Sequence, residues 1–171
     1  MDIFCEYIVK HKKTIKDYLI FVLTDIVAFI LSIIVLMFYN YTMGFGLLII
    51  AAIWYGAYII MRNRFVEYEY ALTSNELDID KIMAKKRRKH IMTVDFKNIT
   101  LCAPADDITF CSEFNNTQAI NKTYDFTGTS RYEIYFADFQ GIDGNTRILF
   151  NPTDKMKESL QLINPRAVHI R

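Results

Sequence analysis

The chain has 171 residues, 52% of them hydrophobic, and its 20 Lys and Arg nearly balance its 19 Asp and Glu. This near-neutral charge gives no support for nucleic-acid binding. The three cysteines and three histidines lack metal-ligand spacing, so we expect neither a metal nor another cofactor. We expect the thiols to be free in a reducing cytoplasm, with a disulfide between Cys102 and Cys111 as the alternative.

The residues before the first apolar run have two open interpretations. Ile3, Phe4, Tyr7, Ile8 and Ile15 cluster on one side of a helical wheel, with the lysines largely elsewhere. This pattern predicts a short helix that lies in the cytoplasmic interface of a membrane. The alternative is a frayed N-terminus with lysines close to the membrane.

Two apolar runs, Tyr18–Tyr39 and Phe45–Met61, predict membrane-spanning helices. About 20 helical residues cross a hydrocarbon core of about 30 Å. The first run, with 22 residues, is long enough, and the second, with 17, is at the lower limit. We therefore expect residues 1–64 to contain the N-terminal interfacial segment and a two-helix transmembrane hairpin, with spans at about 18–39 and 45–61.

Flanking cations predict the orientation of this hairpin. Four lysines between Lys10 and Lys16 precede the first run, Arg62 and Arg64 follow the second, and the connection Asn40–Gly44 is uncharged. Because cytoplasmic flanks carry an excess of Lys and Arg, both termini are expected in the cytoplasm. The sequence thus predicts a multi-pass protein of the cell membrane.

Small and polar residues at helical spacing predict how the two spans pack. Small residues that face each other let membrane helices approach closely, and an acid at the centre of a span costs roughly 2.5–3.5 kcal/mol unless it finds a partner. Tyr55 or Tyr58 is the expected hydroxyl donor to Asp25. The alternative is a small transporter or channel component that uses Asp25 as a proton or ion relay. Six residues are assigned to the seam of the hairpin: Asp25, Ala28, Ser32, Ala52, Tyr55 and Gly56.

After Arg64 the hydrophobic period changes from that of a helix to that of a strand. Residues 65–72 and 76–82 alternate polar and apolar side chains on either side of a turn, which predicts a β-hairpin. A C-terminal amphipathic helix is expected after Asn151–Asp154, with Met156 and Leu160 on its apolar face and Pro165 at its end. Further strands are predicted at 89–96, 99–102, 108–114, 131–139 and 146–150.

This pattern resembles the bacterial pleckstrin-homology-like (PH-like) domain that is found fused to membrane hairpins. The resemblance rests on the hairpin Tyr70–Leu77, the basic stretch Lys85–Lys89, the junction Val94–Ile99 and the final Leu149–Pro152 before the helix. It implies that residues 65–171 form a cytoplasmic, antiparallel split β-barrel capped by a C-terminal helix, so that the chain is an α+β membrane protein. The layout is similar to an uncharacterised clostridial type, and the resemblance implies no established activity.

The densest charge cluster has three open interpretations. Each Lys or Arg beside an anionic leaflet contributes on the order of 1 kcal/mol of binding, so the cluster is a candidate for contact with lipid headgroups. A solvated turn that deters edge pairing and a site for a specific phospho-ligand or nucleic acid are the alternatives. The cluster consists of Lys85, Lys86, Arg87, Arg88 and Lys89.

The sequence contains no arrangement typical of an active site. Ser112, Ser130 and Ser159 lack the context of a nucleophile elbow. We therefore predict a non-enzymatic interaction or scaffold module that is anchored in membrane lipids and binds a protein partner or copies of itself. A sensor of lipid headgroups and the transporter component are the alternatives.

Overall fold

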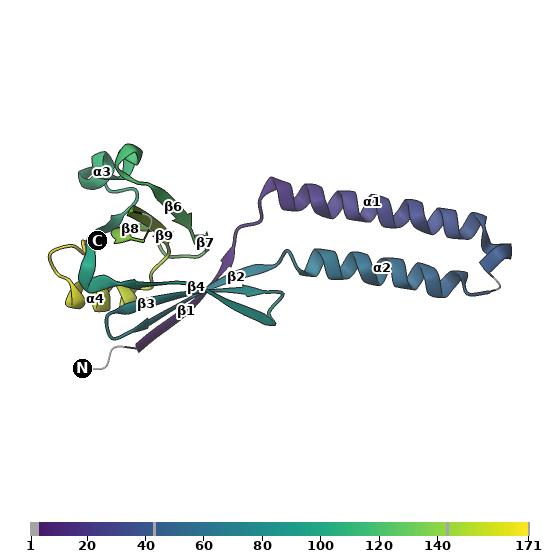
Figure 1. Cartoon of the computed structure of the whole chain (residues 1–171), viewed down its shortest axis with the longest axis horizontal. Coiled ribbons are helices and arrows are strands. Elements are labelled where there is room, and N and C mark those ends of the chain that lie inside the picture. Colours follow the sequence, from purple (N-terminus) through teal and green to yellow (C-terminus); the bar gives the residue numbers. More distant parts are fainter. Residues whose placement is uncertain (1–3, 43, 143, 171) are drawn as a thin grey trace. The chain divides into compact units, whose positions relative to one another are not determined.

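The computed structural model describes residues 4–42, 44–142 and 144–170 (Figure 1). Contacts divide the chain into two compact units. The β unit consists of Met1–Lys12, Glu67–Ile82 and Lys86–Arg171, and the helical unit consists of Lys13–Val66 and Met83–Lys85. The helical unit is therefore inserted into the sequence of the β unit.

The helical unit contains two long helices, α1 (Ile15–Met37) and α2 (Gly46–Arg62), joined through the short helix η1 (Tyr39–Thr42). At the start of α1, the backbone N–H of Thr14 donates to Asp17 at 3.0 Å, and Asp17 also lies 4.0 Å from Arg64. Within the described residues, α1 is the one helix long and apolar enough to cross a membrane, and α2 is a shorter apolar helix. The predicted spans thus correspond to two apolar helices, of which one meets the length for a crossing.

A five-stranded sheet forms one layer of the β unit, in the order β4-β3-β2-β1-β7. β1 pairs with β2 along nearly its whole length, from Phe4 opposite Thr73 to Lys10 opposite Glu67. The strands of this sheet are β1 (Phe4–His11), β2 (Val66–Thr73), β3 (Glu76–Met83), β4 (Arg87–Asp95) and β7 (Gly128–Thr129).

The helix predicted for the N-terminal segment is wrong, because this segment is strand β1. Cys5 and Val9 are buried and face the core, while Glu6, Ile8 and Lys10 alternate with them on the other face. The predicted assignment of residues 1–64 to a single N-terminal part differs from the structure at its start, because Met1–Lys12 belong to the β unit, whereas the β unit resumes at Glu67, close to the predicted boundary. Residues on both sides of the helical hairpin belong to the β unit.

A four-stranded sheet forms the second layer, in the order β5-β8-β9-β6. It is antiparallel except for β6, which runs parallel to β9. Its strands are β5 (Ile99–Pro104), β6 (Lys122–Asp125), β8 (Tyr135–Gly141) and β9 (Gly144–Phe150). The prediction of an α+β chain with antiparallel sheets is confirmed.

The core lies between the two sheets and helix α4 (Asp154–Ile163). Thr153 caps α4 by accepting a hydrogen bond from the N–H of Met156 at 3.2 Å, as a threonine at this position does. The chain then pairs with β5, because Cys102 donates to Ala167 at 2.7 Å and His169 donates to Cys102 at 2.8 Å. The largest fully buried side chains include Tyr70, Leu72, Leu77, Ile79, Phe96, Tyr135, Phe136, Ile148, Phe150, Met156 and Leu160.

The strand predicted at 108–114 is wrong, since this segment forms the short helices η3 (Ile108–Phe110) and α3 (Cys111–Asn115). Arg147 of β9 attaches the segment to the sheet. Its guanidinium group makes a bidentate ion pair with Asp138, at 2.6 and 2.7 Å, and also donates to the carbonyls of Glu113 and Phe114. Arg147 is only 3% exposed, so a buried ion pair supports the hydrogen bonds that attach α3 to the sheet.

Candidate functional site

The predicted basic cluster lies at the turn between β3 and β4. Ala84 and Lys85 both have positive φ, 52° and 56°, which is the backbone of a tight hairpin turn. The N–H of Ala84 donates to the carbonyl of Phe65 at 2.9 Å, and Phe65 follows α2 by three residues. Within the helical unit, this turn therefore lies next to the end of α2.

The structure separates Arg88 from the rest of the cluster. Its guanidinium group lies 2.6 Å from a carboxylate oxygen of Glu69 and 3.9 Å from Asp80. Because side chains alternate along a strand, Arg87 and Lys89 point to the other face of β4. The cations of the cluster that are exposed and have no described partner are Lys85, Lys86, Arg87 and Lys89.

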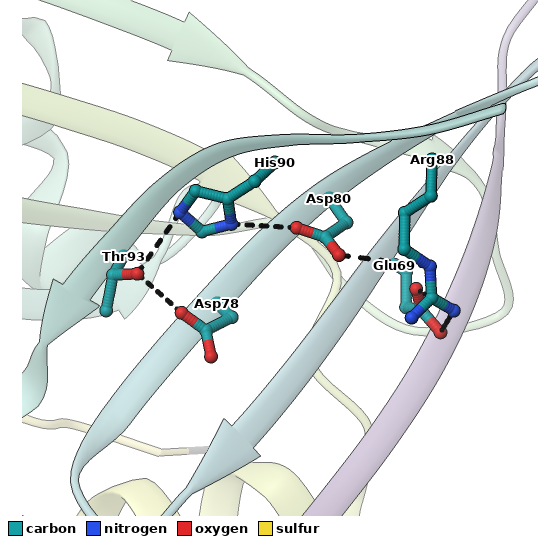
Figure 2. Close-up of polar contacts among 6 residues, drawn as sticks. All are labelled: Glu69, Asp78, Asp80, Arg88, His90 and Thr93. Carbon is teal, nitrogen blue, oxygen red and sulfur yellow. Dashed lines mark hydrogen bonds and ion pairs between the residues drawn. The ribbon is translucent and has the colours of Figure 1, made fainter.

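Arg88 belongs to a polar network on the outer face of the five-stranded sheet (Figure 2). His90 Nδ1 lies 2.8 Å from Asp80, and the hydroxyl of Thr93 donates to Asp78 at 2.5 Å and lies 3.3 Å from His90 Nε2. His90 and Thr93 are three residues apart and still share a face, so the alternation of β4 is interrupted between them. The network connects three neighbouring strands.

Glu69 is the buried member of this network, with 3% of its surface exposed. Burial raises the pKa of its carboxyl group to about 7, and a hydrogen bond with the carboxyl group of Glu6 acts in the same direction, while the charge of Arg88 opposes it. Two carboxyl groups in contact do not ionise together at low cost. The carboxyl group of Glu69 therefore keeps its proton to a higher pH than an ordinary glutamate does.

A shallow groove of about 360 Å³ opens over this network. Phe4 and Glu6 of β1 border it, together with Ala71 of β2. Its acids outnumber its cations, but no group of three or more His, Cys, Asp or Glu in the described part of the chain is arranged to hold a metal ion. The groove offers hydrogen bonds and negative charge, without a nucleophile.

A second groove, of about 530 Å³, runs beside β4. β4 is an edge strand of its sheet, so one row of its backbone N–H and C=O groups has no strand partner. Met92 of β4, Tyr124 of β6 and Phe139 of β8 contribute apolar surface, and Ile142 at the tip of the β8–β9 hairpin is fully exposed. An open strand edge beside apolar side chains suits an extended peptide segment.

Sequence reasoning missed both grooves. The alternation of Glu67 and Glu69 in β2, and of Asp78 and Asp80 in β3, indicates an acidic outer face. Glu6 joins that face only through β1, which was not recognised as a strand. The pairing of strands far apart in the sequence is needed to assemble these groups.

The residues predicted for the seam of the hairpin fall into two groups. Ala28 and Ser32 are buried, and the Ser32 hydroxyl donates to the carbonyl of Ala28 at 2.8 Å. Ala57, which was not predicted, is buried on α2. Contrary to the prediction, the structure does not bring three of the six residues into the contact. Gly56 is half-buried, and Asp25, Ala52 and Tyr55 are exposed.

Comparison with known proteins identifies the family. A family model described as a bacterial PH-like domain (DUF6106) matches residues 1–170. No curated protein and no solved structure matches the chain. The match includes strand β1 as well as the two sheets and helix α4. The chain belongs to the bacterial PH-like domain family.

Proposed function

We propose that this protein is a non-enzymatic interaction module, anchored by a two-helix transmembrane hairpin and presenting its PH-like domain at the cytoplasmic face of the cell membrane. Membership of the PH-like family supports a binding role without catalysis. The proposed anchoring is supported by the position of the helical hairpin in the chain, between the paired strands β1 and β2.

The observation that carries the proposal is that the hairpin connects two hydrogen-bonded strands. β1 and α1 are separated by three residues, as are α2 and β2, and three residues reach only about 10 Å. A single crossing by α1 would put β1 and β2 on opposite sides of the bilayer, which is incompatible with the pairing of Lys10 and Glu67. If α1 crosses, α2 must therefore return.

The length of α2 is compatible with a return crossing. Its 17 residues span about 26 Å, and a shortfall of a few Å is accommodated by thinning of the bilayer at a cost of fractions of a kcal/mol per Å. The cations Lys10–Lys16, Arg62 and Arg64 are all at the end of the hairpin that adjoins β1 and β2. The positive-inside bias then favours the cytoplasm for the PH-like domain.

Cysteine labelling in intact cells tests this topology. Cys111 is exposed and Cys5 and Cys102 are buried, so the native chain already carries one reporter on the PH-like domain. We expect an impermeant maleimide to label Cys111 only after permeabilisation. In a Cys111→Ser background, Tyr41→Cys in the exposed connection should react from outside. Labelling of Cys111 in intact cells would refute the cytoplasmic assignment.

The groove along β4 is the surface best suited to a protein partner, in the form of an extended segment that adds to the strand edge. A photo-crosslinking residue at Ile142, beside this groove, tests the idea in native membranes. The matched control is Leu162 of α4, which is 75% exposed and is not part of the groove lining. A discrete protein adduct at position 142 alone supports the proposal, and equal adducts at both positions or none at 142 contradict it.

Headgroup contact is a second candidate function, favoured by the position of the basic turn next to the end of α2. If the hairpin spans the bilayer, this end lies at the headgroup level. Lys85 lies at this end, and Lys86, Arg87 and Lys89 follow it in the chain. Each exposed cation that reaches the leaflet contributes on the order of 1 kcal/mol. This contact would orient the domain on the leaflet and does not replace the role of partner binding.

A further inference from the structure

Asp25 is exposed at the edge of the hairpin's seam. Ala28 and Ser32 of α1 are buried against α2, whereas Asp25 is exposed. With 3.6 residues per turn, Asp25 lies about 60° around the helix from Ala28 and about 20° from Ser32, so its exposure places it at the edge of the seam. Within the described part of the chain, no hydrogen bond or ion pair reaches its carboxyl group.

An acid in this position needs a partner from outside its own hairpin. Asp25 is ten residues into α1, about 15 Å from the start of the helix, and its side chain is too short to reach the headgroups as a lysine does. Acids within membrane spans almost always face the interior of a helix bundle and pair with other polar groups. A bundle with Asp25 in its interior has more helices than one hairpin supplies.

The same face of the hairpin carries hydrogen-bond donors on α2. Trp54 and Tyr58 are four residues apart, so they share a face of α2, and they are 42% and 52% exposed. Trp54 lies about 60° and Tyr58 about 100° around α2 from the buried Ala57. Because the two helices are antiparallel, this rotation places both residues on the same side of the hairpin as Asp25. An acceptor on α1 and two donors on α2 thus flank the seam on one side.

These groups also lie at matching depth. The Asp17–Arg64 contact marks one level of the hairpin. From that level, Asp25 lies about 12 Å deep, Tyr58 about 9 Å and Trp54 about 15 Å, at 1.5 Å per residue. Side chains lean toward the N-terminus of their own helix, so Asp25 and Tyr58, on antiparallel helices, lean toward each other's level.

We propose that a second copy of this chain packs on this face, with α1 of each copy against α2 of the other. Copies inserted in the same orientation are related by an axis along the membrane normal, so every residue keeps its depth. A two-fold rotation then places Asp25 beside Tyr58 and Trp54 of the neighbouring copy, and does so twice. The contact is isologous and closed.

The apolar residues of this face fit the same arrangement. Phe29 follows Asp25 by one turn and is 60% exposed, and Ala51, one turn before Tyr55 on α2, is exposed and small. Counted from the Asp17–Arg64 level, Phe29 lies about 18 Å deep and Ala51 about 20 Å. The large side chain of one copy thus faces the small residue of the other, as close packing of membrane helices requires.

The inference rests on the proposed crossing of the membrane, so the test measures insertion and assembly separately. In the full chain with Cys111→Ser, Phe29→Cys and Ala51→Cys are placed in two differently tagged copies and co-expressed. Oxidation in native membranes should give a disulfide between the tags. The matched control is Val27→Cys with Ala52→Cys, a pair at similar depth on the other side of the seam, which should give none.

Substitution of Asp25 supplies the second readout. Asp25→Ala should weaken dimerisation in lipid nanodiscs by about tenfold or more, because two interhelical hydrogen bonds are lost, and Asp25→Asn should retain most of it. Tyr58→Phe should weaken it less, since the Trp54 N–H remains. A protein that resists alkaline extraction but stays monomeric, or that cross-links through positions 27 and 52, overturns the inference. A wild-type protein that alkaline extraction releases refutes the proposed anchoring itself.

Discussion

The pairing of β1 with β2 predicts that the PH-like domain can be made soluble by removing the hairpin, provided that β1 is kept. Replacing residues 12–65 with Asn-Gly joins His11 to Val66 by the two-residue turn that suits antiparallel strands. The register from Phe4–Thr73 to Lys10–Glu67 is then preserved. We expect a folded, monodisperse domain. The matched comparison is residues 65–171 alone, which lack β1.

The difference between the two proteins follows from what β1 buries. Val9 is 1% exposed and Cys5 is 7% exposed, and their burial contributes about 3 kcal/mol. Tyr7 packs against Tyr70 and Tyr132 at 6.3 and 5.4 Å between ring centroids, which adds about 1–3 kcal/mol. The net loss is smaller, because the missing strand no longer loses conformational entropy.

Even a net loss of 2–3 kcal/mol lowers the melting temperature of a domain of this size by about 10 °C or more. Thermal unfolding followed by near-ultraviolet circular dichroism, with dye binding as a measure of exposed apolar surface, distinguishes the two proteins. If residues 65–171 alone melt at the same temperature as the loop-closed protein, β1 is not an integral strand and the reasoning fails.

Three further predictions concern the β unit and the basic turn. Arg147→Met leaves Asp138 unpaired near the core and should destabilise the domain by about 3–5 kcal/mol, measured by urea unfolding of the loop-closed protein. The control is Arg131→Met at an exposed position, and an equal effect of the two substitutions would contradict the anchoring role of Arg147. Because the pKa of Glu69 is raised to about 7 in the folded state, the folded domain binds more protons than the unfolded chain between about pH 4.5 and 7, so stability should fall as pH rises through this range. Glu69→Gln should flatten this dependence in melting curves and the exposed Glu76→Gln should not. Replacing Lys85, Lys86, Arg87 and Lys89 with Gln should reduce the salt-sensitive binding of the loop-closed protein to anionic liposomes, with little change in its stability. Arg88→Gln should lower the stability instead. The reverse pattern in flotation and melting assays would refute the separation of Arg88 from the cluster.

The strands that could be predicted from sequence are those in which alternation is clear. β2 and β3 place Tyr70, Leu72, Leu77 and Ile79 inward and acids outward, so the pattern is sufficient. β1 has the same inward alternation at Cys5, Tyr7 and Val9, but Phe4 and Ile8 on its outer face are also apolar. Those two residues hide the period of two and produce a false helical face.

The short helices η3 and α3, which follow β5, could not be predicted from their own sequence. Ile108 belongs to an apolar-looking segment, yet it is 92% exposed. The carbonyls of Glu113 and Phe114 accept hydrogen bonds from Arg147. Arg147 lies more than thirty residues downstream of the segment that it holds. Such contacts leave no mark in the periodicity of the segment itself.

The polar network likewise depends on contacts between residues that are far apart in the sequence. The sequence groups Arg88 with its basic neighbours, but its guanidinium group is held by Glu69, nineteen residues upstream and two strands away. Strand register decides which cations remain available to a ligand. The number of cations in a charged segment therefore overestimates how many of them remain available to bind a ligand.

The insertion of the hairpin between β1 and β2 has a consequence for synthesis. A ribosome produces β1 first, then both apolar helices, and only afterwards β2, the partner that β1 requires. If the hairpin crosses the membrane as proposed, the five-stranded sheet cannot close until the chain has come back to the side of the membrane where it started. A chain that failed to return would leave β1 as an unpaired edge, a state prone to aggregation and degradation. Under the proposed topology, folding of the domain depends on completed insertion of both helices.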